Sequence, residues 1–212
     1  MNAINWGSQP AASSIVPCRL LKHCPMMESH AKDPDPLPRL VHIGEIEFNL
    51  GEVVTGDATP QGTSMFCPIV GGHLKTVYPL PEGFGINSKA TEGLRAEVLP
   101  GGGDNPLIYN NELAQINVSV IAKGQNNDHE FGITSFGLCE WNKLIFDMFN
   151  QNPEARSSEM GEINAWQVFR IKTDSPEYFW LNWACIIGQE KVIYKDSRLS
   201  TTHMKLFQFL VK

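Results

Sequence analysis

Several patterns that would assign a protein class at once are missing from this sequence of 212 residues. It has no run of Lys or Arg, and 23 acidic residues against 17 basic ones give a net charge of -6. A nucleic-acid-binding surface and a polybasic membrane patch are therefore not expected. No apolar stretch reaches the roughly 18 residues that a membrane-spanning helix requires. The N-terminus lacks a basic segment followed by an apolar one, so we expect no secretory signal and a cytoplasmic protein.

Motifs for metals and cofactors are missing as well. The five cysteines form an odd set without a CxxC pair, which indicates free thiols in a reducing compartment. Cys67 and Cys185 lie in apolar runs and are expected to be buried and inert. His42, His129 and His203 show no HxH or HxxxH spacing, so we expect no metal site. Without a GxGxxG or a GxSxG motif, we expect neither a nucleotide cofactor nor a serine nucleophile.

What the sequence does contain, from Leu40 onward, is short runs of alternating apolar and polar residues, which are typical of β-strands. Residues 1–38 are rich in Ser and Pro and are predicted to form a poorly ordered tail, and residues 39–212 a single domain. The regular spacing of the runs predicts an all-β sandwich or barrel. Strands are expected at residues 41–50, 65–70, 93–99, 113–122, 131–136, 166–172, 178–187, 191–194 and 205–211.

One segment has helical spacing instead. Between residues 138 and 149 (LCEWNKLIFDMF) apolar side chains recur every three or four positions, and Asn150 and Pro153 follow as stop signals. We predict one amphipathic helix that packs on the wall of the sheet or across one of its ends. Residues 77–91 contain two prolines and two glycines and are predicted to form a long loop that covers the mouth of a cavity.

Three titratable residues are candidates for chemistry. Asp104 follows three glycines, and it either accepts backbone N–H bonds in a tight turn or places a carboxyl at the mouth or in the interior of a barrel. Glu97 either points to solvent beside Arg95 or points into an apolar interior, which would raise its pKa and keep it protonated. His73 follows a glycine pair and is either a structural histidine or a third candidate acid or base.

The stretch YFWLNW at residues 178–183 has large side chains on both faces of a predicted strand. Tyr178, Trp180 and Asn182 would share one face, where an aromatic wall with a single amide can orient a flat ligand that has one polar group. The π face of Trp180 could also stabilise a carbocation. Plain core packing is the alternative explanation for these side chains.

Three longer segments together resemble a known family. FNLGEVVTGDATPQGTSMFCPIVGGHL, LRAEVLPGGGDN and FRIKTDSPEYFWLNWACIIG are similar, in order and spacing, to the domain-of-unknown-function 3237 family, also called UPF0311, of the fungal secondary-metabolism type. The resemblance covers about residues 40–212. It implies a calycin- or lipocalin-like antiparallel β-barrel with an internal cavity for a small ligand, in a homodimer or homotetramer.

The sequence departs from the family's pattern at several positions. Asn105 stands where the family usually has a tryptophan, and Gln115 and Asn117 replace an aspartate and an arginine of the following strand. These departures put a ligand shared with bacterial relatives in doubt, and they make Asn105 and Asn117 candidate substrate contacts. His73 stands where relatives usually carry a hydroxyl residue.

Two functions follow from this combination. In one fungal branch, the resemblance implies a cofactor-free cyclase or isomerase, which acts by intramolecular hydroalkoxylation of a prenyl-type alkene in a small aromatic polyketide. One of the three candidate acids would protonate the alkene, Trp180 would face the cation, and Tyr178 and Asn182 would hold the phenol. The alternative is a lipocalin-like carrier that binds a hydrophobic metabolite unchanged. An ionisable group that faces the interior distinguishes the two.

Overall fold

The computed structural model describes residues 38–80, 90–109, 112–126 and 128–210. The tail predicted at residues 1–38 lies almost entirely outside the described residues, and so does most of the loop predicted at residues 77–91. Within the described part, no helix is long and apolar enough to cross a membrane.

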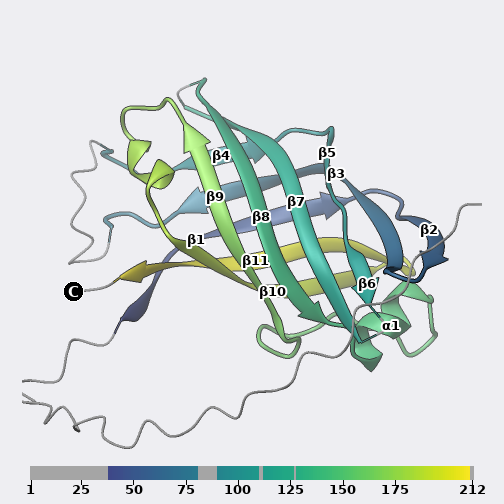
Figure 1. Ribbon diagram of the computed structural model, residues 1–212. Helices are drawn as coiled ribbons and strands as arrows, with labels where there is room; N and C mark the ends of the chain where they lie inside the picture. The colour runs from purple at the N-terminus through teal and green to yellow at the C-terminus, as the bar shows by residue number, and fades with distance from the viewer. Residues whose placement is uncertain (1–37, 81–89, 110–111, 127, 211–212) are drawn as a thin grey trace, which may run out of the picture. The chain divides into compact units, whose positions relative to one another are not determined.

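Eleven strands pair into one antiparallel sheet, and the described residues also form one α-helix and one 3-10 helix (Figure 1). This is the predicted class of fold, mainly antiparallel β with one helix. The elements are β1 (Arg39–Leu50), β2 (Val54–Thr59), β3 (Gly62–Thr76), β4 (Arg95–Val98), β5 (Gly102–Asp104), β6 (Leu107–Tyr109), β7 (Leu113–Gly124), β8 (Glu130–Glu140), α1 (Lys143–Phe149), β9 (Ala165–Thr173), η1 (Phe179–Asn182), β10 (Ile186–Lys195) and β11 (Arg198–Leu210).

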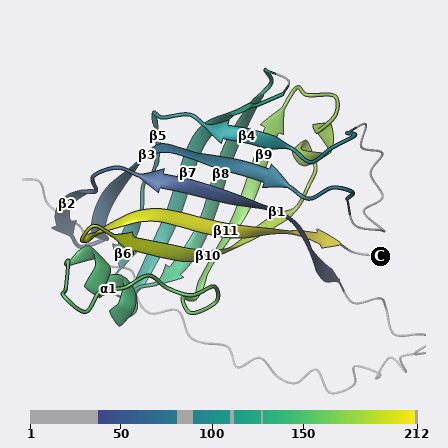
Figure 2. The ribbon, with the colours of Figure 1, turned by 180° about the vertical axis from the view of Figure 1, so that it is seen from behind.

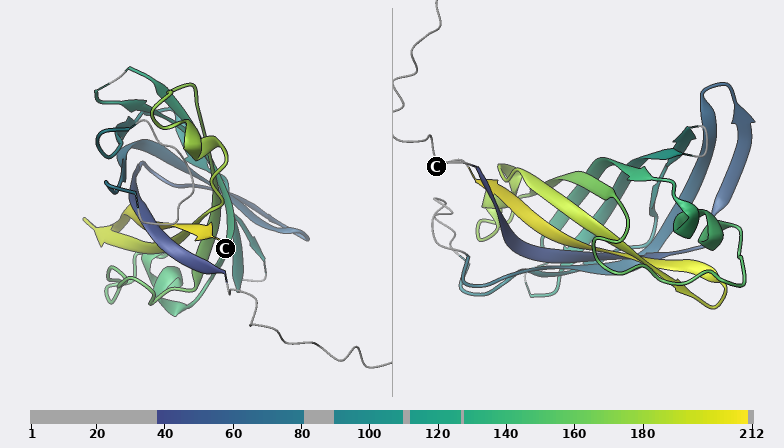
Figure 3. Two further views of the ribbon diagram at one scale, coloured as in Figure 1. Left: turned by 90° about the vertical axis from the view of Figure 1, so that its left-hand side faces the viewer. Right: turned by 90° about the horizontal axis from the view of Figure 1, so that it is seen from below.

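The hydrogen-bonded ladder returns to its first strand. The order is β1-β11-β10-β9-β8-β7, and the short strands β4, β5 and β6 then lie between β7 and β3. Strand β3 pairs in turn with β1, from Gly44 opposite Thr76 to Leu50 opposite Ile69 (Figure 2). Strand β2 pairs only with β3, and the two form a hairpin that projects beyond the rest of the sheet (Figure 3, right). The pairing therefore gives a barrel-like fold.

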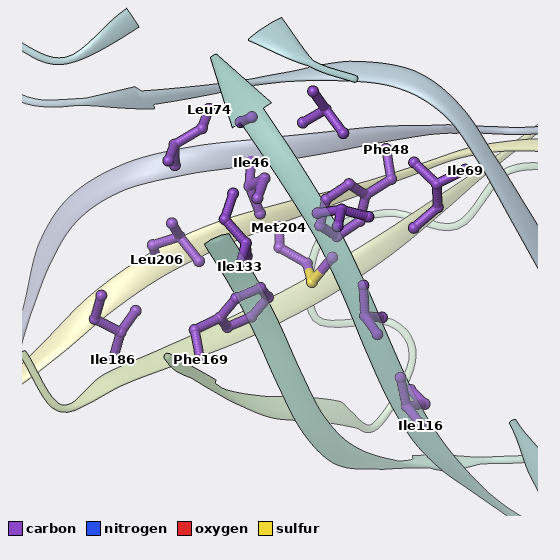
Figure 4. Close-up of a cluster of buried hydrophobic side chains, with 14 of the residues drawn as sticks. Ile46, Phe48, Ile69, Leu74, Ile116, Ile133, Phe169, Ile186, Met204 and Leu206 are labelled. Carbon is purple, nitrogen blue, oxygen red and sulfur yellow. The ribbon is translucent and has the colours of Figure 1, made fainter. Parts of the chain in front are cut away.

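Alternation along the strands creates the core. In β7 every second residue from Ala114 to Gly124 is buried, and β8 repeats the pattern. Side chains such as Phe48, Ile133 and Met204 point from separate strands into the space that the sheet encloses (Figure 4). Each fully buried Leu, Ile or Phe contributes about 1.5–3 kcal/mol relative to an exposed one, so the period-two pattern fixes which face is turned inward.

The predicted helix is present but shorter than expected. Residues 138–140 continue β8, and α1 begins only at Lys143, after Asn142 accepts a hydrogen bond from the Ile145 backbone N–H at 3.1 Å. Ile145 and Met148 are buried, and the helix packs beside β11 at one end of the sheet (Figure 2). Of the two predicted placements, the structure shows the one at the end.

The strand predicted at residues 178–187 is wrong. Residues Phe179–Asn182 form the 3-10 helix η1, and β10 starts at Ile186 and runs through the separately predicted strand at 191–194. The Asn182 side chain explains the turn: its Oδ1 accepts from the Thr173 N–H at 3.1 Å, and its Nδ2 donates to the Thr173 and Phe179 carbonyls. The bond to Phe179, three residues earlier, is of the local kind that competes with a strand ladder.

Candidate active site

A small cavity lies inside the barrel at the end where α1 packs. It encloses about 60 Å³. Two carboxyl groups and one amide line it: Asp104 of β5, Glu190 of β10 and Gln167 of β9. Its walls are otherwise mostly apolar, and they include Phe48, Ile69, Ala114, Ile116, Val118, Trp141, Ile145, Phe149, Val192, Leu199 and Met204.

Asp104 reaches this cavity because of the glycines before it. Gly103 packs so closely on Phe66 that a Cβ there would lie 2.3 Å from the ring, which lets β5 fit between β3 and β7. Asp104 sits opposite the buried Cys67, and its side chain shares that inner face. Its Oδ1 accepts a hydrogen bond from the Asn117 backbone N–H at 2.9 Å. The carboxyl therefore lines the cavity, and the backbone bond that it accepts comes from the neighbouring strand β7 and not from a tight turn.

Glu190 is the second acid of the cavity, and sequence reasoning missed it. Its residue is only 6% exposed. Its Oε2 accepts from Gln167 Nε2 at 2.8 Å, and Gln167 Oε1 accepts in turn from the buried Ser135 hydroxyl at 2.6 Å. The serine therefore orients the amide so that its N–H faces Glu190. Because Gln167 donates to Oε2, a proton carried by Glu190 lies on its other oxygen, Oε1.

The two carboxyls titrate at different pH. Burial raises the pKa of Asp104 to about 6, although the Asn117 and Asn105 backbone N–H groups act in the opposite direction. Burial also raises the pKa of Glu190 to about 7, and the Asp104 charge raises it further against the lowering effect of Gln167. Asp104 has the lower of the two pKa values, and its negative charge, once it has ionised, favours the protonated form of Glu190.

The thiols around this pair remain protonated. Burial, with the charges of Asp104 and Glu190, raises the pKa of Cys67 to about 12, and burial likewise raises the pKa of Cys139. Cys67 is buried, as predicted, whereas Cys185 is exposed because it precedes β10 instead of lying within a strand. Among the described residues, no group of three or more His, Cys, Asp or Glu side chains is arranged to hold a metal ion.

The structure places Glu97 and His73 away from this cavity. The two residues lie opposite each other on β4 and β3, on the outer face of the barrel, and Glu97 is exposed. The His73 side chain is 42% exposed and lies 3.7 Å from a Glu47 carboxylate oxygen. Of the two orientations open for Glu97, the outward one is found, because Ala96 and Val98 take the inward positions.

The residues predicted to hold substrate do not line the cavity either. Tyr178 and Trp180 are buried around η1, where the Tyr178 hydroxyl donates to the Glu92 carbonyl at 3.3 Å, and Asn182 bonds to backbone. Their expected place on one face of a strand is wrong because the segment is a turn of 3-10 helix. The Asn105 and Asn117 residues are exposed, and both approach Asp104 through their backbone N–H groups.

A signal for the missed residues exists in the sequence. Glu190 is an even number of residues from Ile186 and Val192, so the three share one face of β10. Gln167 shares a face of β9 with Phe169 in the same way. Polar residues at the apolar positions of a strand mark an interior site. The predicted strands at 178–187 and 191–194 leave Glu190 in the gap between them, although β10 is continuous there. For this reason the alternation pattern was not applied to Glu190.

Fold and site together define a barrel-like protein with a buried and a half-buried acid in a mostly apolar cavity. The chain belongs to the family described as "Protein of unknown function (DUF3237)", whose model matches residues 38–208. The resemblance seen in the sequence is thereby confirmed.

Similar proteins come from fungi and bacteria. "PR-toxin biosynthesis cluster protein 7" of Penicillium roqueforti is 78% identical over 186 residues, which are 88% of this chain and 100% of that protein. A protein of unknown function from Rhodopseudomonas palustris has a TM-score of 0.66 at 19% identity, over 82% of this chain and 99% of that one. A beta-barrel like protein from Acinetobacter baumannii has a TM-score of 0.57 at 16% identity, over 84% and 99%. These structures support the fold alone.

Proposed function

We propose that this protein is a cofactor-independent cyclase of fungal secondary metabolism, which closes a ring by intramolecular hydroalkoxylation of an aromatic polyketide that carries a prenyl-type alkene. The observation that carries the proposal is the buried Glu190 together with the half-buried Asp104 in a mostly apolar cavity. The similarity to a biosynthesis cluster protein of Penicillium roqueforti supports a role in making a secondary metabolite.

The two acids suit different parts of one reaction. Glu190, with its pKa raised to about 7, is protonated often enough near neutral pH to act as a general acid. Asp104 ionises more readily, and its carboxylate stabilises positive charge that develops beside it. Environments that separate the pKa values of two neighbouring carboxyls are a recurring way to assign acid and counter-charge.

The reaction is an isomerisation. Glu190 gives its proton to the less substituted carbon of the alkene, and the π bond becomes a C–H bond and a tertiary cation. The phenolic oxygen attacks the cation to form the C–O bond, and its proton passes to the carboxyl pair, which restores the starting state. No atom or electron is gained or lost overall. Holding the reacting groups together and excluding water supply most of the acceleration.

A lipocalin-like carrier is the second candidate, and the mostly apolar wall of the cavity favours it. A pure carrier, however, gains nothing from the buried carboxyl of Glu190, because burying an ionisable group costs free energy. Strongly shifted pKa values in a cavity are more typical of sites that do chemistry. The two candidates differ in whether a bound alkene is converted.

Turnover of 2-prenylphenol in D₂O, followed by mass spectrometry of the product, tests the proposal. The wild type should add one deuterium to carbon and close the ring. Glu190→Gln should lower the rate about 100-fold or more, within the range that general acids contribute. Glu97→Gln is the matched control on the outer face and should leave the rate unchanged. Binding without conversion by the wild type would instead identify a carrier.

A further inference from the structure

A second hollow lies directly outside the acid cavity. It is a groove of about 440 Å³ between the β1–β2 connection, α1 and the β10–β11 hairpin. Phe149 of α1 and Leu199 of β11 line both the groove and the inner cavity. These two side chains therefore lie between the groove and the cavity that holds Glu190 and Asp104. Phe149 also packs on Trp141, with ring centroids 4.7 Å apart.

The inner cavity is too small for an aromatic ring. An apolar cavity that binds benzene measures about 150 Å³ in a well-studied engineered protein. The cavity beside Glu190 encloses about 60 Å³, less than half of that. A fragment of a few carbon atoms fits this space, whereas a ring substituted with that fragment has to lie elsewhere.

The groove has the opposite chemistry. Glu52, Gln151, Asp196, Ser197 and Arg198 all line it, so both signs of charge and several hydrogen-bonding groups are present. Asp196 and Ser197 hold positive φ angles of 53° and 57°, which is the geometry of a tight hairpin turn. Because carboxylates and a guanidinium face the same space, neutral groups that both donate and accept hydrogen bonds suit it better than an ion does.

We propose that the substrate binds in two parts: a small branched alkene end occupies the inner cavity next to Glu190, and a neutral hydroxylated ring occupies the outer groove beside Arg198 and the Asp196–Ser197 turn. The reacting oxygen then lies beside Phe149 and Leu199, the two side chains common to both hollows, where it can approach the alkene end. The identity of the alkene as the reacting group rests on the proposed cyclase function, while the division of the ligand does not.

Methionine methyl groups give each hollow its own reporter. Met204 lines the inner cavity, Met148 lines the groove, and Met65 lines neither. The protein with ¹³C-labelled methionine methyls should be titrated with 2-methylpropene, with phenol and with 2-prenylphenol. We expect the alkene to shift Met204 alone, phenol to shift Met148 alone and 2-prenylphenol to shift both with one dissociation constant. Met65 serves as the reference.

Two variants separate the parts further. Ala114→Leu fills the inner cavity and should abolish the Met204 response to the alkene, while the Met148 response to phenol persists. Thr55→Trp, on the exposed rim of the groove, should weaken 2-prenylphenol binding at least 10-fold and leave alkene binding unchanged. Ala58→Leu on the exposed strand β2 is the control. If Ala114→Leu fails to fold, Thr55→Trp and the three ligands still decide.

The outcomes distinguish this proposal from the cyclase function. A Met204 shift with phenol, or a 2-prenylphenol response at one methyl only, would overturn the two-part site, and so would the absence of any response. If 2-prenylphenol shifts both methyls without being converted, the two-part site stands and the cyclase fails. If it is converted while Thr55→Trp has no effect on its affinity, the cyclase stands and the two-part site fails.

Discussion

Glu190 and Asp104 line the same cavity, but different features of the backbone place the two side chains there. Asp104 arrives on a strand of three residues that glycines allow to pack closely, and Glu190 takes a regular inward position of β10. Ser135 and Gln167 then orient the hydrogen bond to Glu190. The pH dependence of the protein is expected to follow from these four residues.

The buried acid makes stability depend on pH. Below about pH 4.5 Glu190 is protonated in both the folded and the unfolded chain, and between that pH and about 7 only the unfolded chain releases the proton. The free energy of unfolding therefore falls as pH rises through this window. Glu190→Gln should consequently raise the free energy of unfolding at pH 8 by about 2 kcal/mol relative to the wild type, and much less at pH 4.

Urea denaturation at the two pH values measures this difference. Glu97→Gln, on the exposed face, should show no pH-dependent change. An equal effect of Glu190→Gln at pH 4 and pH 8 would mean that Glu190 is not held protonated by the fold.

Gln167 is predicted to act as a positioning residue for Glu190. Its N–H stabilises the ionised form, so Gln167→Met should raise the pKa of Glu190 above about 7 and move the alkaline limb of the pH–rate profile to higher pH. Ser135→Ala should move the limb in the same direction by a smaller amount, because the amide loses its orientation. A rate that drops equally at all pH values would point to a purely structural role.

Asp104 could be predicted from the sequence as a site residue, whereas the other polar residues of the cavity could not. Its glycines and the family resemblance both indicated the residue before the fold was known. Trp180 was misplaced because an aromatic stretch with side chains on two faces looks the same as a strand or as a 3-10 turn, and the bonds from Asn182 to Thr173 decide between them. Those bonds are tertiary and leave no local signal.

Among the elements, the pairing of β1 with β3 completes the barrel-like ring, and Gly72 makes it possible. Its φ is +139°, and a Cβ there would lie 1.9 Å from the Glu47 carbonyl oxygen. Gly72→Ala should therefore lower the free energy of unfolding by about 2–4 kcal/mol, as strained backbone positions do. The measurement is urea denaturation followed by circular dichroism.

The adjacent glycine provides a matched control. A Cβ on Gly71 would meet its nearest neighbour only at 3.8 Å, so Gly71→Ala should change the free energy of unfolding by less than about 1 kcal/mol. Similar losses for both variants would show that the pairing of β1 with β3 does not depend on the close approach at Gly72.

How well a strand was predicted depended on how strictly it alternates. Strand β7 was predicted close to its true bounds because every second side chain is buried, whereas β8 was predicted only at residues 131–136 of Glu130–Glu140. Strands β5 and β6 have three residues each, too few for a period to show, and β2 is exposed throughout. The predicted helix is too long at its N-terminal end because Leu138, which lies in β8, fits the helical spacing of apolar residues.

For the whole molecule, the sequence predicts a homodimer or homotetramer, and the outer face of β8 and β9 offers a surface for it. Phe136 lies opposite Val168 and Leu138 opposite Trp166, and all four are exposed. Contiguous apolar patches on a soluble protein usually mark contact sites. We expect this face to pair with the same face of a second copy, and Trp166→Lys to yield monomers.

Sedimentation velocity of the wild type and the variant checks this expectation. Phe179→Lys removes an aromatic ring of similar exposure on η1, outside this patch, and should leave the assembly intact. Assembly that survives Trp166→Lys would assign the interface to another surface, and a monomeric wild type would refute the predicted oligomer.

In the part of the chain that the structure describes, the projecting hairpin leaves one edge of β2 without a partner strand, and such an edge can pair with a strand of another molecule. Closed pairing hides the backbone donors and acceptors of the main strands, so among the described residues β2 is the strand left to recruit a foreign one. Its ladder to β3 is interrupted between Thr55 and Ala58, where Gly56 and Asp57 stand. A bulge and a charge at that position disfavour edge-to-edge pairing of β2 with a strand of another molecule.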